Sequence, residues 1–170
     1  VASGLEAFRR PSLQQALSET IQALNLSQVN AELDRFAPAA DLTKLASLAV
    51  RGEFVFLIPS LLRENPRLLG YYRLLLGYSQ KEFLNKGKLG RFAGMEEKGK
   101  LSARITDEVD ELCRAFCQRA SELLNDIGVE RISVDFLDDL TLLTLGPQLR
   151  GSTNTKIGRL ANPAVFDLIQ

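Results

Sequence analysis

The sequence of 170 residues contains no histidine and only two cysteines. Without imidazole, the chain lacks the most common general base, the Ser-His-Asp triad of serine hydrolases and every zinc site that needs histidine. Two cysteines alone cannot complete a structural zinc site. Any chemistry of this chain must therefore use carboxylates, lysines or a magnesium-type ion.

Signals for nucleotide binding and for membrane insertion are also missing. No Walker phosphate-binding loop and no dinucleotide-binding glycine motif occurs, so nothing supports nucleotide hydrolysis or hydride transfer. No apolar run approaches the roughly 20 residues that span a bilayer, and the chain does not start with the charged-then-apolar pattern of a signal peptide. We therefore expect a cytoplasmic protein without a membrane partner.

The composition, 45% hydrophobic and 25% charged, indicates a globular protein that can bury one good core. We expect an N-terminal helical segment over residues 1–62 and a helical core over 63–170. Cys113 and Cys117 stand four residues apart in a helical pattern. We interpret them as buried packing thiols, because neighbours on one helix face do not readily form a disulfide.

Charge is segregated along the chain although the net charge is zero. Residues 63–104 hold ten Lys or Arg and four Asp or Glu, a net +6, whereas residues 105–140 hold three and ten, a net −7. Such segregation can hide a basic binding face in a neutral protein. The alternative is that the charges are solvated faces, and that the acidic residues at 107–111 simply favour a helix N-terminus.

Apolar residues recur at helical spacing through most of the chain. The spacing predicts helices over about 13–24, 29–36, 41–49, 66–77 and 106–126. The apolar run 53–58 predicts a β-strand or an extended crossing segment, and the run 140–145 predicts a β-strand. The basic, glycine-rich stretch 85–100 predicts a loop with short helical interludes. The predicted fold is mainly α, a helical domain with a few short β-strands. Tyr71, Tyr72 and Phe92 are assigned to its core.

The stretch 146–159 is polar, punctuated by three glycines and without an apolar period, and it is the best candidate for a working surface. Glycines allow a close approach to a partner, and the donors between them suit phosphate oxygens and base edges. The candidates for base contacts are Gln148, Arg150 and Asn154. Lys156 and Arg159 are candidates for phosphate contacts. The plainer interpretation is a solvated loop.

A second group of phosphate candidates follows the predicted helix that ends near Gly77. Ser79 can cap a further turn, whose free N–H groups favour an anion. The candidates in this group are Ser79, Gln80, Lys81, Lys86, Lys88 and Arg91.

Two long stretches carry a resemblance to a known family. They are LLGYYRLLLGYSQKEF at 68–83, followed by GRF and MEE, and LLTLGPQLRGS at 142–152, followed by Asn154, Ile157-Gly158 and Val165-Phe166. Over about 50–170 the sequence resembles the N-terminal half of type II restriction endonucleases of the XcyI family. The resemblance implies a prokaryotic, homodimeric, magnesium-dependent enzyme that cleaves double-stranded DNA at a GC-rich palindrome.

The sequence departs from that family at the catalytic centre, because residues 1–170 contain no convincing pair of carboxylates followed by Glu-x-Lys. Asp138 and Asp139 precede an apolar run, as does Glu53, but neither run carries a carboxylate or lysine. We therefore expect a fragment of a longer α/β nuclease that holds the DNA-recognition and scaffold part. No catalytic or metal residue is assigned to it, and the magnesium site is expected beyond residue 170.

Two alternatives stay open. A helical protein-interaction or assembly module would need only the apolar helices and the acidic stretch 107–111, and it would not bind DNA. A stand-alone carboxylate enzyme would need Glu53, Asp135 and Asp138 to converge in a pocket.

Overall fold

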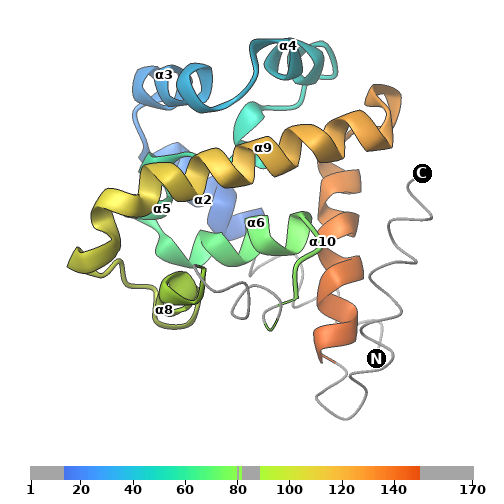
Figure 1. The fold of residues 1–170 in the computed structure, drawn as a ribbon. Helices are drawn as coiled ribbons and strands as arrows, with labels where there is room; N and C mark the ends of the chain where they lie inside the picture. The colour runs from blue at the N-terminus through green and yellow to red at the C-terminus, as the bar shows by residue number, and fades with distance from the viewer. Residues whose placement is uncertain (1–13, 80, 82–88, 150–170) are drawn as a thin grey trace.

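The computed structural model describes residues 14–79, 81 and 89–149, and within these ranges the fold is entirely helical (Figure 1). The α-helices are α2 (Gln15–Ala23), α3 (Leu26–Phe36), α4 (Ala39–Ser47), α5 (Pro59–Glu64), α6 (Leu69–Leu75), α8 (Ala93–Lys98), α9 (Val109–Ile127) and α10 (Val134–Leu149). Short 3-10 helices are η2 (Gly52–Phe54), η3 (Pro66–Leu68), η4 (Gly90–Phe92), η5 (Ala103–Glu108) and η6 (Val129–Arg131).

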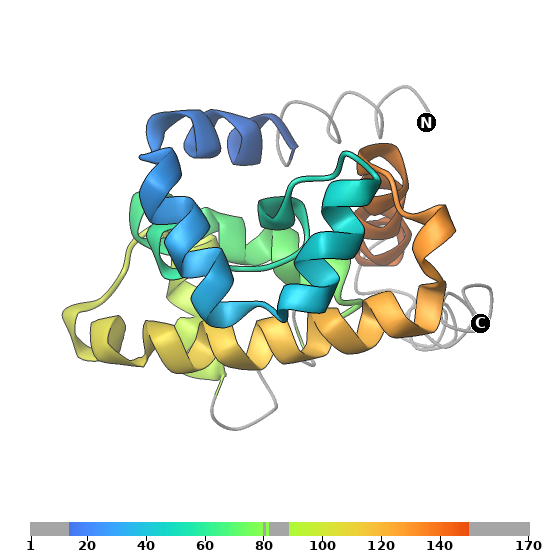
Figure 2. The same cartoon turned by 90° about the horizontal axis from the view of Figure 1, so that it is seen from above.

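Helix α6 lies at the centre of the molecule. Figures 1 and 2 show α9 running along one side of it and α10 crossing near its C-terminal end, and Figure 1 shows α3 and α4 above both α9 and α6. The side chains of α6 are buried from Leu69 to Leu75, because neighbouring helices cover it all round. No helix within the described ranges has the length and hydropathy to cross a membrane.

The long helix α9 confirms the strongest helical prediction. Its apolar residues hold a 3.6-residue period and are buried, and Gly128 ends the helix with a positive φ of 84°. The 3-10 helix η5 precedes α9, so helical backbone begins at Ala103, slightly before the predicted Thr106. Cys113 and Cys117 are free and buried, as predicted.

Helix α3 starts at Leu26, slightly before the predicted residue 29. Asn25 is the N-cap, and its side-chain oxygen accepts hydrogen bonds from the backbone N–H of Ser27 at 2.9 Å and of Gln28 at 3.3 Å. Helix α4 likewise starts at Ala39, slightly before the predicted residue 41. Asp41 lies in its first turn, where the carboxylate accepts a hydrogen bond from the hydroxyl of Ser121 of α9 at 2.5 Å.

Of the two predictions for residues 53–58, the strand is wrong, whereas a crossing segment that is extended at Ile58 leads into α5. Residues Gly52–Phe54 form η2, and the chain then runs without a strand partner into α5, which begins at Pro59. Side chains from Val55 to Leu62 are all buried. A segment buried on every side shows no apolar period, so its sequence is compatible with a buried strand and with a buried helical connection.

The predicted strand over 140–145 is also wrong, because these residues lie inside α10. Leu137, Leu140 and Thr141 are buried, and α10 packs against α6. Helix α10 is apolar on most sides, which hides the helical period. The helix also continues to Leu149, so the first four residues of the stretch 146–159 are helical and not part of a loop.

The basic stretch 85–100 contains the short helical interludes that the sequence predicts, but its exclusion from the core is wrong. Residues 90–98 form η4 and α8, and Phe92 and Met95 of this pair are fully buried. A single hydrophobic cluster runs from Leu17 to Leu140 and includes both, together with Tyr71 and Tyr72. The assignment of Tyr71, Tyr72 and Phe92 to the core is therefore confirmed.

Candidate functional site

Four of the predicted DNA-contact residues lie within the described ranges, and the surroundings of three side chains are described: Ser79 is half-buried, and Lys81 and Arg91 are exposed. Gln148 belongs to α10. The other candidates, namely Gln80, Lys86, Lys88, Arg150, Asn154, Lys156 and Arg159, lie outside the described residues.

A hydrogen bond holds the backbone where the chain leaves α6, just before Ser79. Arg73 donates from Nε and Nη2 to the two carboxylate oxygens of Glu96 in α8, at 2.9 and 2.6 Å, and from Nη1 to the backbone carbonyl of Tyr78 at 2.6 Å. The Arg73 side chain is only 4% exposed and that of Glu96 is 21% exposed. One guanidinium therefore ties the end of α6 to α8, using the planar fork that suits a carboxylate.

A glycine allows this contact. Gly70 stands three residues before Arg73 on α6, and a Cβ atom at position 70 would lie 3.0–3.1 Å from the Glu96 side chain. Residues three apart on a helix share a face, so Glu96 packs over Gly70 and reaches Arg73. A side chain of α9 also interacts with Tyr78. Arg119 has a raised pKa, chiefly because of its hydrogen bond to Glu122, with smaller contributions from Tyr78.

Arg91 lies at the other end of the basic segment. Its guanidinium forms an ion pair with Glu108 of η5 and its Cζ lies 5.1 Å from the centroid of the Phe92 ring. The arginine side chain is 40% exposed, which leaves part of the guanidinium accessible. Two ion pairs, Arg73–Glu96 and Arg91–Glu108, therefore hold the described residues on either side of the basic segment 79–91.

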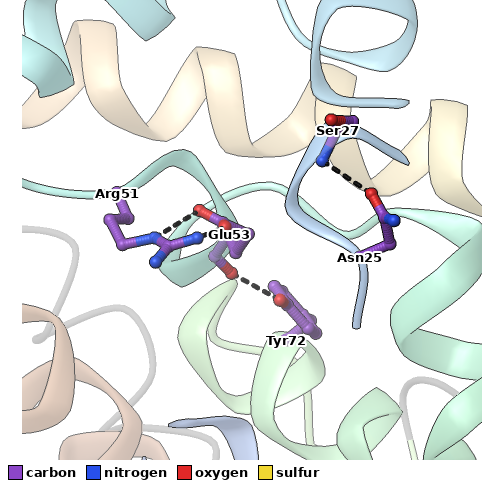
Figure 3. A network of polar contacts seen from close by, with 5 residues as sticks. All are labelled: Asn25, Ser27, Arg51, Glu53 and Tyr72. Carbon is purple, nitrogen blue, oxygen red and sulfur yellow. Dashed lines mark hydrogen bonds and ion pairs between the residues drawn. The ribbon is translucent and has the colours of Figure 1, made fainter. Parts of the chain in front are cut away.

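A second polar network, which the sequence analysis missed, surrounds the turn η2 (Figure 3). Arg51 donates from Nη2 to Oε1 of Glu53 at 2.5 Å and from Nε to Oε2 at 3.4 Å. The Glu53 side chain is 2% exposed and that of Arg51 is 49% exposed. A buried carboxylate thus holds a half-exposed guanidinium at the surface.

Two tyrosines of α6 fix the backbone of this turn. The hydroxyl of Tyr72 donates to the carbonyl of Glu53 at 2.5 Å, and the hydroxyl of Tyr71 donates to the carbonyl of Phe54 at 2.8 Å. Their rings meet edge to face with centroids 5.0 Å apart. Burial raises the pKa of both phenols well above the usual value, with a further contribution from Asp138 at Tyr71 and from Tyr71 at Tyr72.

The alternative carboxylate site does not form from the described residues. Glu53 is paired with Arg51, Asp135 is exposed, and Asp138 is buried on α10. Within the described ranges, no group of three or more His, Cys, Asp or Glu side chains could hold a metal ion. These residues therefore supply neither a metal centre nor a convergent acid and base pair.

Arg51 and Arg73 lie outside the polar, glycine-rich stretches in which candidate cations are predicted. Arg51 stands four residues after the end of α4, and Arg73 lies inside the apolar run of α6. The signal for Arg51 is the tripeptide Arg-Gly-Glu at 51–53, which places opposite charges two residues apart before a buried run. For Arg73 it is a charge inside an otherwise apolar helix.

Comparisons with known proteins point to one family. A family model described as XcyI restriction endonuclease matches residues 2–170. Two curated relatives are the type II restriction enzymes XcyI from Xanthomonas campestris pv. cyanopsidis and Cfr9I from Citrobacter freundii; each is 46% identical to this chain over 172 residues, which covers 99% of the chain. The same region is 52% of each relative, so the chain spans about half of their length. No solved structure matches the chain.

Proposed function

The chain belongs to the XcyI restriction endonuclease family, and we propose that it is the DNA-recognition and scaffold part of a type II restriction enzyme that cleaves a GC-rich palindromic site. The observation that carries the proposal is the match over residues 2–170, with 46% identity to two type II restriction enzymes. The basic segment 79–91, held between two arginine ion pairs, is consistent with a phosphate-binding role.

In this proposal the chain acts as part of a longer polypeptide, because its relatives are about twice as long. Gln148, Arg150 and Asn154 contact base edges. Phosphates are contacted by Ser79, Gln80, Lys81, Lys86, Lys88, Arg91, Lys156 and Arg159. Arginine can bind a guanine edge with two parallel hydrogen bonds, and lysine supplies a point charge to a phosphate.

The proposed enzyme uses Mg²⁺ to activate water and to stabilise charge at the scissile phosphate. Such an ion requires oxygen ligands, chiefly carboxylates. Since the described residues offer no suitable cluster, we assign no metal ligand within them. We also propose a homodimer, because a two-fold palindrome is read most simply by a two-fold symmetric protein.

Cleavage by the whole protein tests this function. Plasmid DNA would be incubated with Mg²⁺, the fragments separated, and both fragment ends sequenced; a chelator in place of Mg²⁺ is the control. The proposal predicts discrete fragments with one common end sequence, and no cleavage in the chelator. The absence of duplex binding would instead favour a helical assembly module, and duplex binding without sequence preference or cleavage would contradict site-specific cleavage.

A further inference from the structure

We propose that Arg51 contacts a phosphate of the bound DNA backbone and that Glu53 is the residue that positions its guanidinium. This inference rests on the proposed function and adds a contact that lies outside both predicted basic segments. It starts from the network of Arg51, Glu53 and Tyr72 in Figure 3.

The guanidinium of Arg51 is oriented and still has donors to offer. A guanidinium carries five N–H donors, and the contacts to Glu53 use one from Nη2 and the one on Nε. The remaining three belong to a side chain that is 49% exposed. Because both contacts go to one carboxylate, the plane of the guanidinium is set by Glu53, and less side-chain entropy is lost when an anion binds.

The turn that carries the pair is itself held in place. The hydroxyls of Tyr72 and Tyr71 bind the carbonyls of Glu53 and Phe54. Gly52, between the two charged residues, packs closely against α3 and α4: a Cβ atom there would lie 2.8 Å from Leu42 Cδ2 and 3.2 Å from Leu33 Cδ1. Arg51 is therefore mounted on packed backbone, as a binding residue requires.

The stability of the fold gives only a weak reason for the presence of the ion pair between Arg51 and Glu53. Removing a carboxylate from water costs several kcal/mol, and apolar residues of similar volume are often as stable as a buried ion pair. The buried member here is the acid, whereas the cation remains half-exposed. This is the arrangement in which a carboxylate holds a cation toward a ligand, and among the residues that the structure describes Arg51 has no other ion-pair partner.

A backbone phosphate fits this geometry better than a base edge. Base edges are reached by elements that enter a groove, such as a helix or a β-ribbon. Arg51 instead folds back onto Glu53 two residues away, on a short turn packed into the protein. Its guanidinium stays near the protein surface, where it can meet the outer face of a duplex.

The test uses the whole protein and duplex DNA, and it removes both charges together. In the double variant Arg51→Met/Glu53→Gln no buried charge is left without a partner, so the fold should be kept, which thermal unfolding checks. Arg63→Met is the matched control, because Arg63 is also half-exposed (50%) and is paired with Asp110 at 3.8 Å. Affinity is measured over a range of salt concentrations on two unrelated duplexes.

Loss of one phosphate contact should reduce the slope of log K against log salt by about 0.9 and weaken binding about eightfold at 0.1 M salt, equally on both duplexes. The control should match wild type. An unchanged double variant, or an equal loss in Arg63→Met, would overturn the assignment of Arg51. Failure of the wild type to bind DNA would instead contradict the proposed function.

The single variant Glu53→Gln tests the positioning role through the sign of its effect. If Glu53 merely adds negative charge near DNA, its removal strengthens binding. If it orients Arg51, its removal weakens binding although the protein has become more positive. Stronger binding by Glu53→Gln would overturn the positioning role.

Discussion

Arg73 of α6 and Glu96 of α8 form a bidentate ion pair whose arginine also binds the backbone carbonyl of Tyr78. The pair joins two helices that are separated in sequence by the basic segment 79–91. The same guanidinium therefore fixes the backbone at Tyr78, just after α6.

Glu96→Ala should destabilise the protein by about 3 kcal/mol. Breaking a buried pair leaves an uncompensated charge, which costs roughly 3–5 kcal/mol, and the partial exposure of Glu96 places the effect at the lower end. Urea unfolding measures the change. The exposed Glu111→Ala is the control and should change stability by less than about 0.5 kcal/mol. Equal effects of the two variants would show that the pair is not a structural tie.

Ala49→Gly should stabilise the protein by about 0.5–1 kcal/mol. Ala49 follows α4 with a left-handed φ of 56°, a conformation that costs an L-residue about 1–2 kcal/mol and glycine almost nothing. The greater freedom of glycine in the unfolded chain offsets part of this gain. As a control, Ala46→Gly in the last turn of α4, where glycine has only the disadvantage of its greater freedom, should destabilise the protein by about 0.5–1 kcal/mol. A loss of stability in both variants would contradict the assigned backbone conformation.

Stability should fall as the pH rises above about 9. Burial raises the pKa of the Cys113 thiol well above its usual 9.0 and that of Cys117 to about 12, and it raises the pKa of Tyr71 and Tyr72 above 10. The folded state therefore keeps protons that the unfolded state releases, so the free energy of unfolding decreases with pH. The contribution of these buried side chains to stability is fully present below pH 9. It is lost as the pH rises toward their pKa values in the folded state.

Urea unfolding between pH 7.5 and 10.5 measures this dependence. In the double variant Cys113→Ala/Cys117→Ala, the free energy of unfolding should no longer decrease from about pH 9. The decrease that the tyrosines cause should remain and should begin near pH 10. A free energy of unfolding that does not change with pH in the wild type would show that these groups are not buried.

Helices with one buried face could be predicted from the sequence, because one face repeats every 3.6 residues. Helices α3 and α9 are examples, with Val29, Leu33 and Phe36 as the buried row of α3. The prediction failed at 53–58 and 140–145 for one physical reason. Residues 55–58 are all buried, and α10 is apolar on most sides, so neither run carries an apolar period that distinguishes a strand from a helix.

The candidate site was harder to predict than the fold. The composition of the sequence indicates cations in polar stretches. The positions of the Arg51 and Arg73 side chains depend instead on partners and neighbours that tertiary packing brings close. Glu96 reaches Arg73 over Gly70, and the carbonyl of Glu53 reaches the Tyr72 hydroxyl across 19 residues. Such pairs have no local pattern in sequence. The base-contact assignments stay predictions, since Arg150 and Asn154 lie outside the described residues and the Gln148 side chain is not described.

Arg150→Lys should separate base reading from phosphate binding. Lysine keeps the charge and loses the planar fork, so a guanine contact would lose about 1–3 kcal/mol on the cognate duplex and almost nothing on a scrambled one. Competition binding of the whole protein to both duplexes at fixed salt measures the difference. Equal losses on the two duplexes would make Arg150 a backbone contact, and no loss on either would remove it from the interface.

The central claim, that this chain engages duplex DNA through its basic residues, is tested most directly by the salt dependence of binding. Wild type and the double variant Lys81→Ala/Lys156→Ala of the whole protein would be titrated with duplex DNA over a range of salt concentrations. We predict that the slope of log K against log salt concentration is about −0.9 for each phosphate contacted. In the variant the slope should be less negative by about two units. A wild-type affinity that does not depend on salt, or the same slope in both proteins, would contradict the claim.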